Sequence, residues 1–127
     1  MYLDKNYLQT KLKDDSEKTI DFLADSVKGN LDENQPQNVI LFNDSEKSYI
    51  SENCKGNNIS IWIKDKRFIP KGYTIRSCDM GQNDSHPRSW VIEGSIDQNS
   101  WIIIDQQQDC QFLNGPSLVH YFTIDNK

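Results

Sequence analysis

The sequence predicts an all-β fold, an antiparallel β-sandwich, from three observations. Short apolar runs with a period of two recur along most of the chain, as half-buried strands require. Turn-forming Gly, Asn, Asp, Pro and Ser residues separate these runs. Aromatic residues make up 10% of the chain, although hydrophobic residues make up only 35%. Because each aromatic ring buries a large area, a few of them can anchor a thin core between two sheets.

The first 18 residues differ from the rest. Leu3, Tyr7, Leu8 and Leu12 have the spacing of one face of a short helix, and a charged connection follows them. We therefore divide the 127 residues into an N-terminal helix with its connection, residues 1–18, and a sandwich over residues 19–127. A domain of this length buries one modest core, but not a core together with a large active-site cleft.

The strands are predicted from alternation. In residues 20–25 apolar and polar side chains alternate, which favours a strand and leaves a helix as the alternative. Residues 28–38 have the composition of a loop, and residues 39–42 are a short apolar run that opens the strand-rich part. The remaining predicted strands are residues 59–65, 73–77, 89–94, 101–105 and 118–124.

Connections between these strands are predicted from turn chemistry. Residues 96–100 have the composition of a hairpin turn, in which we expect Asn99 to take the left-handed conformation. Gly94 marks a bulge or a close backbone approach. Residues 106–108, three glutamines, are predicted to be a polar turn. His120 alternates with Leu118 and Phe122, which places it on the core face.

Charge excludes several kinds of partner. The net charge is −5 and the pI about 4.9, whereas nucleic-acid surfaces need clustered Lys and Arg. Attachment to anionic lipid is disfavoured for the same reason. The chain has no apolar leader at its start and no apolar run long enough to span a membrane. We therefore expect a cytoplasmic protein that binds a neutral or basic surface, or another protein.

Three cysteines, Cys54, Cys78 and Cys110, lack the spacing of a zinc site or of a disulfide framework. We expect three free thiols, with a Cys78–Cys110 bridge as the alternative. Catalytic motifs are also missing, so neither an enzyme nor a cofactor is predicted. His86 lies in a polar loop beside Arg88, where the pair could recognise an anion or a hydroxyl-rich ligand. The alternative is that residues 85–87 only shape the path into the next strand.

Five motifs carry a family resemblance: YTIRS at residues 73–77, HPRSWVIEGS at 86–95, W-x-x-x-D at 101–105, LNG at 113–115 and LVHYF at 118–122. Together they resemble the discoidin, or coagulation factor 5/8 type C, family, whose fold is a galactose-binding-like jelly roll. They are most similar to a cytosolic protist branch that is often appended to BTB or kelch-like proteins. The similarity covers residues 39–124 and extends towards Ile20.

The resemblance implies which residues form the core and where this sequence departs from the family. Trp90, Ile92 and Trp101 would lie between the sheets, together with Tyr73 and Phe122. Two turns depart from the family: residues 96–98 lack its Asn-Asp-Gly, and residues 43–45 lack the Gly of an Asp-Gly turn found near calcium, so no metal is expected. The family also continues through further strands where this sequence stops, so the sandwich is expected to be incomplete at its C-terminal end. It is then a fragment, or a partner chain closes its open edge.

The resemblance favours a non-catalytic protein-interaction or scaffold module, as a structural component of a cytoskeletal or ciliary assembly. Its binding loop would comprise Asp79, Met80, Asn83, Ser85, His86 and Arg88. The alternative is carbohydrate binding through Asn83, His86 and Arg88. Binding of lipid head groups would need apolar loop tips with a basic surround, and only Leu31 and Met80 offer such tips.

Overall fold

A computed structural model of the chain describes residues 20–25, 36–40, 49–51, 56–64, 67–79 and 86–125. These residues form six strands and one 3-10 helix, and every strand pairing is antiparallel, which confirms the predicted all-β character. The chain divides into two compact units, Leu3–Lys66 and Arg67–Lys127. The predicted N-terminal helix lies outside the described residues.

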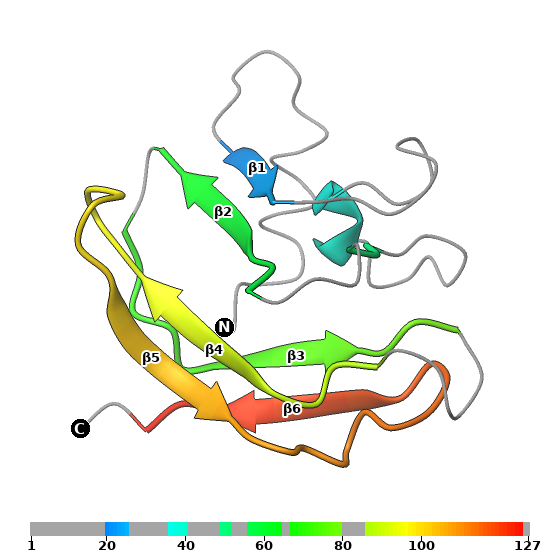
Figure 1. The fold of residues 1–127 in the computed structure, drawn as a ribbon. Helices are drawn as coiled ribbons and strands as arrows, with labels where there is room; N and C mark the ends of the chain where they lie inside the picture. Colours follow the sequence, from blue (N-terminus) through cyan, green and yellow to red (C-terminus); the bar gives the residue numbers. More distant parts are fainter. Residues whose placement is uncertain are drawn as a thin grey trace. The chain divides into compact units, whose positions relative to one another are not determined.

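The first unit contains β1 (Ile20–Ala24) and β2 (Ile59–Ile63), which form a two-stranded sheet (Figure 1). The register pairs Phe22 with Ile61, so the alternating apolar positions of both strands share one face. Residues 20–24 are therefore a strand and not the alternative helix. At one end of this sheet the Asp25 carboxylate accepts hydrogen bonds from the backbone and side-chain nitrogens of Asn58, at 3.2 and 2.6 Å.

The 3-10 helix η1 (Pro36–Ile40) corrects the prediction of a loop up to residue 38 followed by an extended apolar run. It contacts β1. Proline fixes φ close to the helical value and lacks the amide hydrogen that a first helical turn leaves unbonded. Pro36 therefore favours a helical turn, and Asn38 is buried within it.

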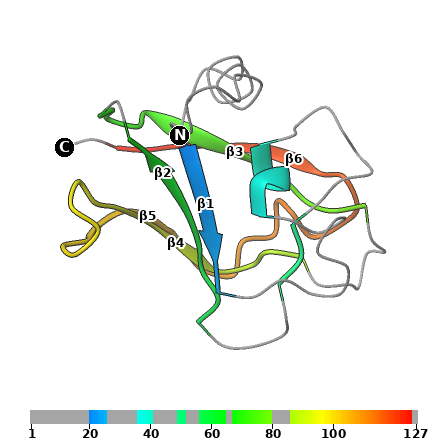
Figure 2. The same ribbon diagram turned by 90° about the horizontal axis from the view of Figure 1, so that it is seen from above.

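The second unit consists of two two-stranded sheets that face each other. One pairs β3 (Gly72–Arg76) with β6 (Val119–Thr123), and the other pairs β4 (Trp90–Gly94) with β5 (Ile102–Gln107). The β4–β5 pair crosses the β3–β6 pair in the view of Figure 1 and lies to one side of it in the view of Figure 2. The five predicted strands of residues 59–124 are thus confirmed, with ends shifted by one or two residues.

The core of the second unit lies between its two sheets. The Tyr73 and Phe122 rings, from opposite positions on β3 and β6, stack at 5.0 Å. The Trp90 ring of β4 meets Phe122 edge-on at 5.2 Å. Leu113 is fully buried beside them. His120 is half-buried on the same side of β6, with its ring 4.6 Å from Phe122, as its alternation predicts.

A β-bulge on β5 moves Trp101 out of the predicted core. Ile92 pairs with Asp105 but Glu93 pairs with Ile103, so Ile104 is an extra residue. The Ile104 side chain covers Gly94, where an added Cβ would lie 2.6 Å from Ile104 Cδ1. The predicted close approach at Gly94 is therefore confirmed, but Ile104 fills the position expected for Trp101. The Trp101 side chain is 48% exposed.

Two turn predictions are wrong. The left-handed residue of the β4–β5 turn is Gln98, with φ of 62°, and not Asn99. Asp97 Oδ1 accepts hydrogen bonds from the Asn99 and Ser100 amides, which fixes the chain direction after Gln98. Gln106 and Gln107 are not a turn either: they extend β5 by pairing with Val91 and Trp90. The chain turns after them, where Asp109 has φ of 48°.

Candidate functional site

Three residues of the predicted binding loop are described, and each contacts a different partner. The Asp79 carboxylate accepts a hydrogen bond from Ser117 Oγ at 3.3 Å. His86 is buried, with Nδ1 3.9 Å from the sulfur of Cys78. The Arg88 guanidinium donates to Asp109 Oδ1 at 2.6 Å. The other three residues of this loop, Met80, Asn83 and Ser85, lie outside the described residues.

The burial of His86 bears on its predicted role. A side chain that is 9% exposed offers little surface to a large ligand, and its ring already faces the Cys78 sulfur. Neither Cys78 nor Cys110 is in a disulfide, so the alternative bridge between them is not formed. Cys54 lies outside the described residues.

Arg88 and Asp109 continue the β4–β5 ladder beyond its strands. The Cys110 amide donates to the Arg88 carbonyl at 2.7 Å, and the Asp109 amide donates to Ser89 Oγ at 3.0 Å. The ion pair between Arg88 and Asp109 is mostly exposed, so it contributes little to stability. The pair does, however, engage the Arg88 guanidinium, the cation that the sequence suggested for recognition of an anion.

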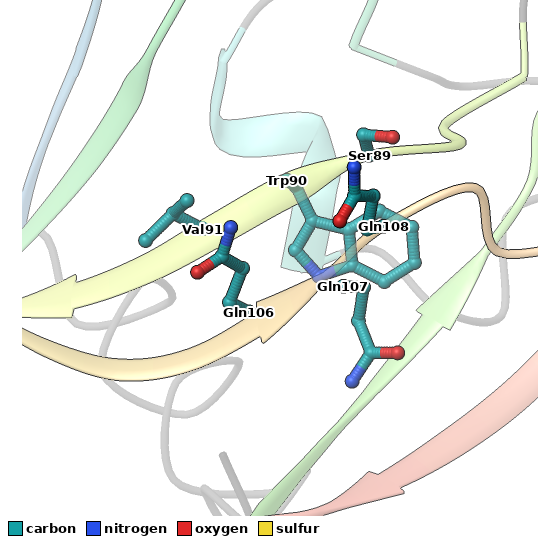
Figure 3. A pocket seen from close by; sticks show the side chains of 6 residues that line it. All are labelled: Ser89, Trp90, Val91, Gln106, Gln107 and Gln108. Atoms are coloured by element: carbon teal, nitrogen blue, oxygen red, sulfur yellow. The ribbon is translucent and has the colours of Figure 1, made fainter.

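Beside this pair lies a groove of about 300 Å³ between the start of β4 and the end of β5 (Figure 3). Its lining combines one aromatic ring with hydroxyl and amide groups and contains no charged side chain: Ser89, Trp90, Val91, Gln106, Gln107 and Gln108. Such a surface suits a neutral ligand with many hydroxyl groups, because amides both donate and accept hydrogen bonds.

Hydrogen bonds beneath the groove fix two of its side chains. Trp90 Nε1 donates to the Tyr73 hydroxyl at 2.9 Å, and that hydroxyl donates to Asp105 Oδ2. Gln107 Nε2 donates to the same carboxylate oxygen at 3.1 Å. The Trp90 ring and the Gln107 amide are therefore held in position from the core side.

The same network shifts two ionisation equilibria. Burial raises the pKa of Tyr73 well above its usual value, and the hydrogen bond to Asp105 adds to this effect. Burial alone would raise the pKa of Asp105 too, but hydrogen bonds from Tyr73 and Gln107 outweigh it and hold the pKa below its usual value. Near neutral pH the hydroxyl is thus protonated and the carboxylate ionised.

A second feature is a set of exposed apolar side chains on the β4–β5 hairpin, which we call the hairpin patch. It consists of five large side chains that are 45–73% exposed: Val91, Ile96, Trp101, Ile102 and Ile103. Val91 and Ile103 lie on the outer face of the sheet, opposite Gln106 and Glu93, whereas Ile102, opposite Gly94, lies on the other face. Exposed apolar side chains add nothing to the stability of a fold in water, and clusters of them are typical of binding surfaces.

Two carboxylates border the hairpin patch. Glu93 is exposed directly across the ladder from Ile103. Asp97 lies in the turn, where hydrogen bonds from the Ser100 and Asn99 amides and from the Ser95 hydroxyl lower its pKa to about 2. Asp97 is therefore ionised near neutral pH.

The described residues bring together no group of three or more His, Cys, Asp or Glu side chains that would hold a metal ion. Among the helices in this part of the chain, none is long and apolar enough to cross a membrane. Comparison with models of known protein families and with curated proteins finds no match for the chain.

Neither the groove nor the hairpin patch was predicted from the sequence. The apolar run from Trp101 to Ile104 was visible, but a strand that is apolar on both faces is equally typical of a buried core. The sequence predicts a turn for the three glutamines at residues 106–108, because short polar runs usually form turns. Only the pairing with β4 shows that two of them belong to a strand.

Proposed function

We propose that this chain is a non-catalytic protein-binding module and that the hairpin patch is its contact surface. The observation that carries the proposal is the exposure of five large apolar side chains on one hairpin. Burying apolar surface contributes about 25 cal/mol per Å², so a partner that covers these side chains gains substantial binding energy. Trp101 is the strongest single anchor, because tryptophan is enriched among residues that dominate binding.

The wider setting rests on the family resemblance. A discoidin-like jelly roll is compatible with two antiparallel pairs that face each other across Tyr73, Trp90 and Phe122. Among the described residues, β4 and β5 form a sheet only with each other, so a further strand can add to their open edges. We propose that a partner chain supplies such strands, and that the module serves as a cytoplasmic scaffold in a larger, cytoskeletal or ciliary assembly.

A comparison of two double variants tests this function. The full chain is immobilised and exposed to lysate of its own cells, and the captured proteins are quantified by mass spectrometry. In the variant Trp101→Ser/Ile103→Ser the hairpin patch loses two anchors. The matched control Phe68→Ser/Ile69→Ser removes two side chains that are 45% and 76% exposed outside the hairpin.

The proposal requires a partner that the wild type and the control variant capture at equal levels and the hairpin variant loses. Equal loss in both variants would assign the effect to general stickiness of apolar surface. Loss in the control variant alone would move the binding surface to residues 68 and 69, and the proposal would then be wrong.

The groove favours a second candidate function, the binding of a neutral carbohydrate. Its support is one aromatic ring with amide and hydroxyl groups, fixed from below by Tyr73 and Asp105. A glycan array probed with the full chain tests it. Replacing the exposed Gln106 and Gln108 by Ala leaves the core untouched, so a genuine hit must weaken in that variant. An array without signal above background removes this candidate.

A further inference from the structure

We infer that the partner segment bound by the hairpin patch is basic as well as apolar: an extended protein segment in which Lys or Arg residues flank hydrophobic anchors. This inference rests on the proposed protein-binding function and adds the charge of the partner to it. The argument comes from the charges on and around the hairpin.

The hairpin carries charge of one sign only. Between Ser89 and Cys110 the sequence has four acidic residues and no Lys or Arg. Asp105 bonds to Tyr73, and Asp109 pairs with Arg88. Glu93 and Asp97 border the hairpin patch and are exposed. Asp97 accepts hydrogen bonds from the amides of its own turn, but these amides carry no net charge to balance the carboxylate.

Covering the patch therefore brings a partner up against two negative charges. A neutral apolar partner would take water away from Glu93 and Asp97 and return no hydrogen bond or opposite charge, which is unfavourable. Asp97 cannot escape this cost by protonation near neutral pH, because its turn amides stabilise the carboxylate. A basic partner offsets the cost, since each cation can pair with a carboxylate at the rim.

The same charges disfavour two other occupants. A second copy of the chain that packed patch against patch would place its own Glu93 and Asp97 beside the first pair, and like charges repel. A membrane with anionic lipids would repel the hairpin for the same reason. The occupant that fits both the apolar surface and its acidic border is a basic protein segment.

A peptide library provides the probe. Random dodecapeptides displayed on phage are selected on the immobilised full chain, after removal of those that bind the variant Trp101→Ser/Ile103→Ser. We expect the selected peptides to be enriched in hydrophobic residues and in Lys and Arg, and depleted of Asp and Glu. Selection without a basic preference would overturn the inference while leaving the proposed function standing. Selection of no peptide that distinguishes the two proteins would count against the proposed function itself.

Two charge reversals with equal effect on net charge then test the mechanism. Glu93→Lys should weaken the best peptide roughly three- to tenfold, as expected for turning an exposed attraction into repulsion. Asp125→Lys, at an exposed carboxylate beyond β6 and outside the hairpin, should change the affinity less than about twofold because salt screens distant charges. Equal effects of the two variants would show only a general charge response and would contradict the inference.

Two other experiments test whether a second copy of the chain or an anionic membrane covers the hairpin patch instead. Sedimentation equilibrium of the full chain would reveal a dimer that the Trp101→Ser/Ile103→Ser variant abolishes, and that result would make the patch an interface between copies. Sedimentation with phosphatidylserine vesicles, lost in the same variant, would make it a lipid contact. Either result would overturn the assignment of a basic protein partner.

Discussion

At the scale of single residues, a few polar contacts position the aromatic core of the second unit. The Tyr73 hydroxyl accepts from Trp90 and donates to Asp105, so one atom joins three strands. The sequence motifs contain all three residues, and the burial of Tyr73 was predicted. Their bonding could not be predicted, because it depends on how β3 lies against the β4–β5 sheet, which no local pattern encodes.

Replacing Tyr73 with Phe tests the value of this contact. The change keeps the ring but leaves Trp90 Nε1 without its acceptor and Asp105 without one donor. We expect the free energy of unfolding to fall by about 1–3 kcal/mol, the usual range for a buried polar group left unsatisfied. Urea denaturation of the full chain measures it. Thr74→Val removes a hydroxyl from the exposed side of the same strand and should change stability by less than about 0.5 kcal/mol.

The raised pKa of Tyr73 predicts a loss of stability at alkaline pH. A group whose pKa is higher in the folded state stabilises the fold fully below its unfolded value, 10.0, and this contribution is lost as the pH rises towards the folded value. Absorbance at 295 nm should therefore show one of the five tyrosines ionising only after the others, or only as the protein unfolds. In Tyr73→Phe this late step should vanish. Its persistence in the variant would assign the late ionisation to a different tyrosine.

At the scale of elements, the alternation of apolar and polar residues predicted the strands well. It did not predict the turn conformations or the bulge. Strand residues alternate between two environments, and this period of two is written directly into the sequence. The bulge at Ile104 and the left-handed Gln98 have no such signature. Isoleucine is an ordinary strand residue, and Asn takes the left-handed conformation more readily than Gln. At the turn, hydrogen bonds to Asp97 decided against the local preference. At the bulge, the Ile104 side chain packs over Gly94.

The β4–β5 turn should depend on Asp97. Its carboxylate accepts from the Asn99 and Ser100 amides at 2.9 and 2.8 Å, so Asp97→Ala should speed hydrogen exchange at both amides. Asp97→Asn keeps one side-chain oxygen and should speed it less. Because the pKa is lowered from 3.8 to about 2, protection present above pH 3.8 should survive at pH 3 and be lost as the pH falls through 2. Unchanged exchange in the Ala variant would mean that the turn is held by other contacts.

At the scale of the whole molecule, the sequence predicted an all-β chain correctly but did not predict the groove or the hairpin patch. The predicted loop residues Asp79, His86 and Arg88 each contact a neighbour within the second unit. The groove and the hairpin patch lie instead on β4, β5 and the segments that adjoin them. An apolar run such as that of residues 101–104 reads the same whether it is buried or exposed, so only the three-dimensional packing separates a core strand from a binding strand.

The most direct test of the central claim is photo-crosslinking from the hairpin patch. Benzoylphenylalanine is placed at Ile103 in one sample and at Thr74, exposed on the other sheet of the same unit, in a second. Each sample is mixed with the partner captured from lysate and irradiated, and mass spectrometry then identifies the crosslinked protein. The proposed function predicts a specific partner crosslinked from position 103 and none from position 74. A partner crosslinked from position 74 but not from position 103 would contradict it.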